Sequence, residues 1–203
     1  AVDDVTPTAN EEAWADVTGA SAAPGGTGGN NMMHYSNSSL MDGLTVMASY
    51  TPSNGTTEVE SSSDYGVEYT GIDGLTIGAA QGEDNTSSSA GVETETMYVT
   101  YTMDAFSVGY QTSEDDSETS GSDQDFTALG ISYAVSDDMS VSLNTSTHEY
   151  ESSTLSDQEA MGVSVSYTMG SMTLTANHNS VDNVAGTSTN DRSGYAMSVA
   201  FAF

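Results

Sequence analysis

The side chains of this sequence that could do chemistry are mostly carboxylates. Its 203 residues include 30 Asp and Glu, one Arg (Arg192) and no Lys, so the formal net charge is -29. Carboxylates concentrate cations and repel anions, and rings of them make a pore prefer cations. A nucleic-acid partner is excluded, because phosphate binding needs Lys and Arg. The absence of cysteine excludes a disulfide scaffold and thiolate metal sites.

Five carboxylates gather in an opening segment, residues 1–31, in which apolar and polar residues do not alternate. They are Asp3, Asp4, Glu11, Glu12 and Asp16. We expect most other carboxylates in long solvated loops and tight turns, and only Glu68 and Glu95 within strands. Acidic outer loops, such as the one at Glu114, could offer oxygen ligands to Ca²⁺, although no spacing resembles a dedicated Ca²⁺ loop. No other metal and no cofactor is predicted.

Catalysis has little support in the sequence, and no catalytic residue is predicted. Ser and Asp are abundant and the three His are scattered, so chance triads are common. His178-Asn179-Ser180 faintly resembles the site of a barrel phospholipase. His178 shares the parity of Met172 and Leu174, however, which favours the edge of an apolar face. His34 and His148 are expected to be structural, and the protein is expected not to be an enzyme.

The elements that position these carboxylates are predicted to be strands. Strict alternation of apolar and small residues marks a strand with one apolar face. The last nine residues show it most clearly, with one face made of Tyr195, Met197, Val199, Phe201 and Phe203. No apolar run approaches the roughly 20 residues of a transmembrane helix. A transmembrane strand needs only about 9–11 alternating residues, so the modest hydropathy is compatible with a membrane.

The alternating runs repeat along the chain around tight turns. Asp42-Gly43 and Asp73-Gly74 are strong hairpin signals. The first apolar residues after successive turns are 31, 31, 33 and 33 positions apart: Leu44, Leu75, Phe106, Met139 and Met172. This pattern predicts eleven strands, near 32–37, 43–51, 64–70, 74–82, 94–103, 105–113, 125–136, 138–149, 158–169, 171–180 and 193–203.

Long loops alternate with short turns, so all long loops should lie at one end, as in outer-membrane barrels. Aromatic residues of the apolar face should form two girdles. The girdle at the short-turn end would contain Tyr69, Tyr101, Phe106, Tyr133 and Tyr167, and the other Tyr50, Tyr110 and Tyr195. Glu68 has the opposite parity to its apolar neighbours and should point into the lumen.

Two local irregularities carry predictions of their own. Thr8-Ala9-Asn10-Glu11 fits a capping box, which predicts a short helix over 12–17. Phe126 breaks the alternation of its strand, which indicates a β-bulge.

At this point the chain resembles a Gram-negative outer-membrane general porin of the trimeric, sixteen-stranded type. The terminal aromatic strand, the hairpin repeat and the passage 28–37 leading into Met41-Asp42-Gly43-Leu44 carry the resemblance. It implies a passive, water-filled channel, a homotrimer, outer-membrane lipid around the barrel and a terminal strand that acts as assembly signal. It also implies that residues 1–31 form a pore-constriction loop and residues 32–203 the barrel strands.

Eleven is an odd number, whereas bacterial single-chain barrels have even numbers of strands. The resemblance implies five strands before the constriction loop, so we expect the chain to be the last two-thirds of a porin, closed by N-terminal strands absent from this sequence. Porins of this type usually set basic wall residues against acidic loop residues, and this sequence has no basic wall.

The sequence therefore predicts an all-β protein, an antiparallel transmembrane β-barrel that forms a cation-preferring channel for small hydrophilic solutes. Two alternatives stay open. The first is a secreted acidic β-sandwich or adhesin, which also uses alternating strands. The second is a barrel phospholipase.

Overall fold

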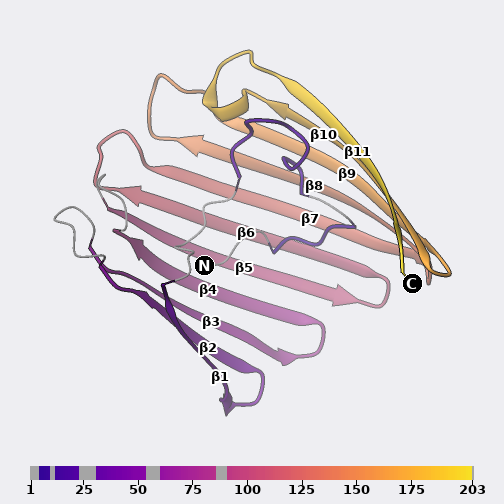
Figure 1. Cartoon of the computed structure of the whole chain (residues 1–203), viewed down its shortest axis with the longest axis horizontal. Coiled ribbons are helices and arrows are strands. Elements are labelled where there is room, and N and C mark those ends of the chain that lie inside the picture. Colours follow the sequence, from indigo (N-terminus) through magenta and orange to yellow (C-terminus); the bar gives the residue numbers. More distant parts are fainter. Residues whose placement is uncertain (1–4, 10–11, 23–30, 54–59, 86–90, 203) are drawn as a thin grey trace.

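A computed structural model describes residues 5–9, 12–22, 31–53, 60–85 and 91–202. Its eleven strands form one antiparallel sheet in chain order (Figure 1). The strands are β1 (Met33–Met41), β2 (Leu44–Thr51), β3 (Ser62–Ile72), β4 (Leu75–Asp84), β5 (Val92–Met103), β6 (Phe106–Ser117), β7 (Gln124–Ser136), β8 (Met139–Tyr150), β9 (Gln158–Met169), β10 (Met172–Asp182) and β11 (Arg192–Phe201). A short 3-10 turn, η1 (Val184–Gly186), precedes β11.

The hairpin repeat predicted from the sequence is confirmed. The even-numbered strands begin at the expected residues, Leu44, Leu75, Phe106, Met139 and Met172. Gly43 and Gly74 adopt φ of 77° and 72° in their turns, a left-handed conformation that glycine tolerates without steric cost.

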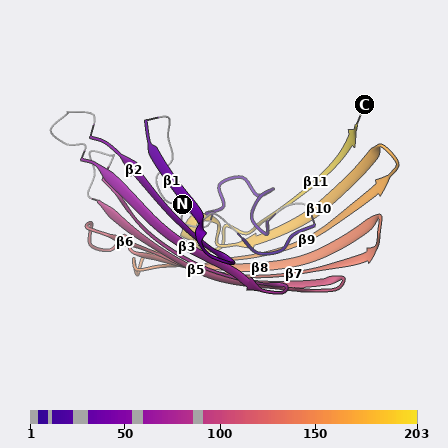
Figure 2. The same ribbon diagram turned by 90° about the horizontal axis from the view of Figure 1, so that it is seen from below.

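The sheet is curved into a trough, with the N-terminal segment on its concave side (Figure 2). Large apolar side chains point to the convex side, where Met97 is 61% and Val163 51% exposed. Their polar neighbours on the concave side are buried, with Thr96 and Ser164 both 3% exposed. Because all described strands form a single sheet with β1 and β11 at its edges, the β-sandwich alternative is wrong.

The strands extend further toward the long loops than the sequence suggested. The expectation that only Glu68 and Glu95 lie within strands is therefore wrong, since backbone pairing continues through polar residues. Strands also contain Asp64, Glu83, Asp84, Glu93, Glu114, Asp115, Asp116, Asp125, Glu149, Glu159 and Asp182.

The predicted helix over 12–17 does not form. Its described residues make successive turns instead, in which the Ala15 amide donates to the Glu12 carbonyl at 3.2 Å and the Val17 amide to the Trp14 carbonyl at 3.1 Å. Asn10 and Glu11 of the expected capping box lie outside the described residues. In the described part of the chain, no helix is long and apolar enough to cross a membrane.

The bulge predicted at Phe126 is also wrong. Phe126 pairs in register with Ser113 on β6 and His148 on β8. Its ring is 1% exposed on the concave side and meets Trp14 edge to face, with ring centroids 5.3 Å apart. An apolar side chain is stable there because the N-terminal segment covers it.

Candidate functional site: the inner wall and its inward segment

Residues 5–9 and 12–22, here called the inward segment, cross the inner wall from β6 to β11 (Figures 1 and 2). Backbone amides of the inward segment donate to side chains of the wall at three places. Val5 donates to Gln111 Oε1 at 2.9 Å, Ala9 to Ser142 Oγ at 2.9 Å and Ser21 to Gln158 Oε1 at 2.8 Å. These bonds bind a chain that lacks regular secondary structure to a rigid sheet.

A transverse row of glycine and asparagine lies beneath the inward segment. Its members are paired directly across six successive strands, and we call them the Gly/Asn band: Gly109, Gly130, Asn144, Gly162, Asn179 and Gly194.

Each residue type of the Gly/Asn band has its own role. A Cβ at Gly162 would lie 2.8 Å from Ala13 Cα, so only glycine allows this approach of the two backbones. The asparagines donate to backbone carbonyls of the inward segment. Asn144 Nδ2 reaches Pro7 O at 3.0 Å, and Asn179 Nδ2 reaches Glu12 O at 2.5 Å. The band thus holds the inward segment against the wall.

A small apolar cluster fixes the second half of the inward segment. Ala13 is 0% and Val17 5% exposed, and both pack with residues of β9, β10 and η1: Ala160, Val181 and Val184. Ser21 Oγ and Tyr150 OH are 2.7 Å apart, which adds a hydrogen bond at the end of this stretch.

His148 belongs to the wall beneath the inward segment. Its ring is 4% exposed, stacks on Tyr150 with centroids 4.9 Å apart and pairs through Nε2 with Gln124 Oε1 at 2.6 Å. These contacts agree with the structural role expected for His148.

The predicted constriction residues are described only in part. Glu12 and Asp16 lie half-buried on the inward segment. Asp3, Asp4 and Glu11 lie outside the described residues. A pore-lining role for all five stays a prediction, as does the division of the chain at residue 31.

Glu68 lies on the inner face of β3, where its carboxylate accepts a hydrogen bond from Tyr98 OH at 2.7 Å. The Tyr98 ring crosses Gly78 of β4, and a Cβ at Gly78 would collide with it. Because glycine has no side chain, the Tyr98 ring of β5 can cross β4 at Gly78 and reach Glu68 on β3.

Many other carboxylates occupy the opposite, convex face near the long loops. Four of them pair directly across β5 to β8: Glu95, Glu114, Asp125 and Glu149. With them lie Glu83, Glu93, Asp116, Glu159 and Asp182, all exposed, and we call the nine residues the outer collar. Like charges directly opposite repel each other across a sheet. Sequence reasoning missed the collar because it assigned all of these residues except Glu95 to loops.

Arg192 binds the inward segment at the start of β11. Its guanidinium donates through Nη1 to the Thr18 carbonyl at 3.0 Å and through Nε to Asn190 Oδ1 at 3.1 Å.

Among the described residues, no group of three or more His, Asp or Glu could hold a metal ion.

His178 is exposed on the convex face, paired with Val163 and Tyr195, as its parity predicted. Asn179 lies on the other face, 1% exposed in the Gly/Asn band. In the His178-Asn179-Ser180 sequence, His178 thus belongs to the convex face of the sheet and Asn179 binds the inward segment.

The profile of the Gram-negative porin family matches residues 1–203. This chain belongs to the Gram-negative porin family. The porin is accordingly a protein of the bacterial outer membrane. No curated protein sequence matched in a separate comparison.

Solved structures share the porin fold. OmpT of Vibrio cholerae is 16% identical, with a TM-score of 0.58 over 85% of this chain and 64% of that one. OmpF of Salmonella typhi is 13% identical, with a TM-score of 0.67 over 84% and 61%. A mutant porin of Rh. blastica is 16% identical, with a TM-score of 0.61 over 85% and 68%.

These likenesses confirm the fold class, an antiparallel outer-membrane β-barrel. The chain spans less than two-thirds of the length of the OmpT and OmpF chains.

The membrane orientation of the two faces gives a first prediction. Val165 lies in the middle of the apolar stretch of β9, between Val141 and Ala176 on neighbouring strands. Val165→Arg should cost roughly 2–4 kcal/mol of barrel stability, because a cation near the midplane of the bilayer is poorly solvated. Urea unfolding of the porin in lipid vesicles measures this cost.

Ser166→Arg is the matched control, because Ser166 is the next residue and faces the lumen. Ser164 would be a poor control, since it is 3% exposed and within 2.7 Å of Ser142 Oγ beneath the inward segment. Equal losses at Val165 and Ser166 would contradict the assignment of the two faces.

The terminal strand gives a second prediction. Its alternate residues face outward with Tyr195 85%, Met197 73%, Val199 48% and Phe201 58% exposed, and Phe203 lies outside the described residues. Deletion of Phe203 should lower the amount of barrel assembled in the outer membrane and leave the conductance of each assembled channel unchanged. Heat-modifiable gel migration and single-channel recording measure the two quantities. A normal yield of barrels would contradict the assembly role.

Proposed function

We propose that this porin forms part of a passive, water-filled channel that prefers cations and admits small hydrophilic solutes. The observation that supports it best is the sign of the charges on the concave side. Asp64, Glu68 and Asp115 lie on the inner face of strands, and Glu12 and Asp16 on the inward segment. Arg192 is the one Lys or Arg of the sequence, and it donates to Thr18 and Asn190.

Fixed carboxylates near a narrow lumen act on permeating ions, since the Debye length is about 10 Å at 0.1 M salt. Rings of acidic side chains are a common basis of cation selectivity in pores. The inward segment crosses the concave side, which supports a role for its carboxylates at the narrowest part. This proposal assigns Asp3, Asp4, Glu11, Glu12 and Asp16 to the constriction.

We further propose that additional strands of the same protein close the barrel, because exposed sheet edges are costly in lipid. β1 and β11 are the edges of the described sheet. A homotrimer is proposed by analogy with OmpT of Vibrio cholerae, which has a structure in trimer form.

Ca²⁺ is proposed to neutralise part of the outer collar and the acidic loops as weakly held ions without a fixed coordination site, since carboxylate oxygens are its usual ligands. The direct pairing of Glu114 with Glu95 and Asp125 supports this, because an oxygen-binding cation would relieve their repulsion.

The reversal potential of the intact porin in a KCl gradient tests the channel proposal. We expect K⁺ to be preferred over Cl⁻, with a preference that weakens toward 1 M salt as screening increases. An anion-preferring or unselective channel would overturn the proposed selectivity.

A further inference from the structure

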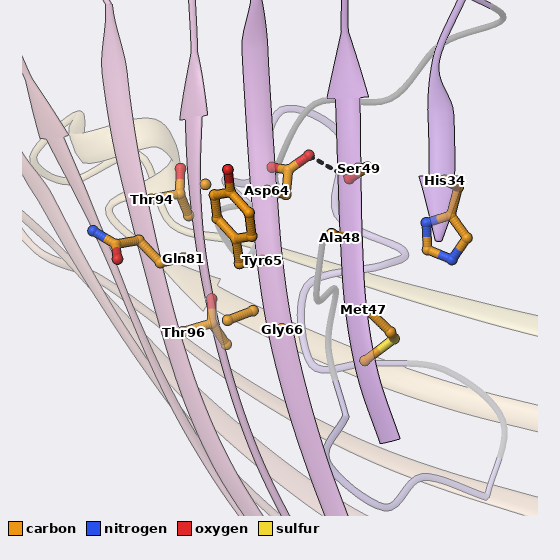
Figure 3. Close-up of a pocket in the computed structure, with 12 residues that line it drawn as sticks. His34, Met47, Ala48, Ser49, Asp64, Tyr65, Gly66, Gln81, Thr94 and Thr96 are labelled. Carbon is orange, nitrogen blue, oxygen red and sulfur yellow. Dashed lines mark hydrogen bonds between the residues drawn. The ribbon is translucent and has the colours of Figure 1, made fainter. Parts of the chain in front are cut away.

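A second feature of the inner wall lies on the strands β1 to β5, away from β6 to β11 where the inward segment is bound. It is a cavity of about 120 Å³. Figure 3 shows the side chains around it. The inner-face residues used here are Met47, Ser49, Asp64, Ala80, Thr94 and Thr96.

Asp64 is the charged group of this cavity. Its side chain is 8% exposed, and Oδ2 accepts a hydrogen bond from Ser49 Oγ at 2.8 Å. The other oxygen, Oδ1, is buried and has no hydrogen-bond partner among the described residues. It lies over Gly82, where a Cβ would collide with it. A buried carboxylate oxygen without a partner is costly, so a donor that reached this atom from the cavity would stabilise the site.

The hydroxyl groups around Asp64 already donate hydrogen bonds to protein groups. Ser49 donates to Asp64, Thr94 Oγ1 donates to Asp115 Oδ1 at 2.6 Å, and Thr96 Oγ1 donates to Ser113 Oγ at 3.0 Å. Each hydroxyl has one proton and two lone pairs, so all three offer only acceptors to the cavity. Together with Asp64 Oδ1 they form a set of acceptors that suits a ligand made of donors.

The charge of the ligand follows from the residues nearby. One carboxylate lines the cavity, and the sequence contains no Lys. Arg192 donates its hydrogen bonds to Thr18 and Asn190 at the other end of the sheet. A single positive charge on the ligand would match Asp64. A doubly charged metal would lack a second carboxylate.

The size and apolar lining of the cavity distinguish an organic cation from a bare ion. A water molecule occupies about 30 Å³ in the liquid, so a cavity of about 120 Å³ is larger than a bare monovalent ion needs. Met47 and Ala80 add apolar surface next to the acceptors. A primary ammonium group on a short alkyl chain offers three N–H donors to the acceptors and an apolar part to Met47 and Ala80.

We propose that this cavity binds the protonated primary amine of a small cationic solute, a role that deepens the proposed cation-preferring channel and rests on it. The ammonium group donates to Asp64 Oδ1 and to the hydroxyl oxygens of Thr94 and Thr96. Its alkyl part contacts Met47 and Ala80.

Calorimetric titration of the intact porin in detergent with butylammonium chloride tests the site. Tetramethylammonium is the matched probe, because it has the same charge and no N–H donor. Wild-type porin should bind butylammonium measurably tighter than tetramethylammonium. Equal binding of the two ions, or no butylammonium binding, would overturn the proposal.

Two substitutions on β3 separate the site from the general charge of the lumen. Asp64→Asn and Glu68→Gln each remove one inner-face carboxylate. Asp64→Asn should weaken butylammonium binding roughly tenfold or more, because a charge-assisted hydrogen bond is lost. Glu68→Gln should keep wild-type affinity, since Glu68 is already bonded to Tyr98. Equal losses in both variants would overturn the site.

Thr96→Val is a second variant in case Asp64→Asn assembles poorly. It leaves the charge in place, removes one of the two hydroxyl acceptors of the ammonium group and should weaken binding severalfold. Unchanged affinity in an assembled Asp64→Asn variant, or in Thr96→Val, would contradict the site. Binding that depends on Asp64 in a porin without K⁺ preference would support the site and overturn only the proposed selectivity.

Discussion

Replacing Gly162 with valine is expected to push the inward segment off the wall and to lower the single-channel conductance. The backbone of Ala13 packs on Gly162, and even a Cβ there would lie 2.8 Å from Ala13 Cα. Overpacking of this kind costs about 1–3 kcal/mol, which is comparable to what a few hydrogen bonds contribute. The wall blocks movement in one direction, so the displaced segment moves into the lumen.

Single-channel recording on the intact porin measures the change, together with protease cleavage within residues 12–22. We expect lower conductance, more open-channel noise and faster cleavage. Ala134→Val is the control, because Ala134 is exposed on the inner face of β7, away from the inward segment and from the Asp64 cavity. Gly194→Val should reproduce the Gly162 effect, since Gly194 packs on the backbone of Asp16. Wild-type conductance in both would contradict the role of the Gly/Asn band.

Neutralising Glu12 and Asp16 together is expected to have the largest effect on selectivity. At the dielectric constant of water, a unit charge about 7 Å from a permeating ion contributes roughly 0.6 kcal/mol, or about RT. Each carboxylate therefore changes cation entry by roughly two- to threefold, and the pair by more. The K⁺ over Cl⁻ permeability ratio of Glu12→Gln/Asp16→Asn should fall accordingly at 0.1 M KCl.

The matched control is Glu114→Gln/Asp125→Asn, which removes the same number of charges from the outer collar. These two residues are paired on the convex face, so the wall separates them from the lumen. Their loss should leave the permeability ratio nearly unchanged. A larger effect from the outer collar than from the inward segment would show that selectivity arises elsewhere in the porin.

The strands were predictable because their signals are local. The turn before Leu75 and the alternation after it are both contained in a few neighbouring residues. The strand ends were harder to predict, since the polar stretch at Glu114 looks like a loop until its pairing with Glu95 is known. Phe126 was misinterpreted for a related reason. The residue that buries it, Trp14, lies more than a hundred positions earlier in the chain.

The Gly/Asn band escaped the sequence analysis because each member looks like an ordinary strand residue. The signal that could have revealed the band is the pairing register of neighbouring strands. Hairpin turns fix which residues are opposite each other, and that places Gly130 beside Asn144 and Gly162 beside Asn179. The Asp64 cavity was equally hidden, since its acceptors come from separate strands and depend on where each hydroxyl proton goes.

The connections of the inward segment determine the order in which the porin can be built. Val5 binds a residue 106 positions away, Asn179 binds Glu12 across 167 positions, and Arg192 binds Thr18 across 174. Contacts so distant in sequence form late, because the loop-closure entropy must be offset by strands already in place. The inward segment, which precedes all the described strands in the sequence, is therefore among the last parts to dock. The bond from Arg192 to the Thr18 carbonyl needs β11 in place, so complete attachment of the inward segment marks a finished wall.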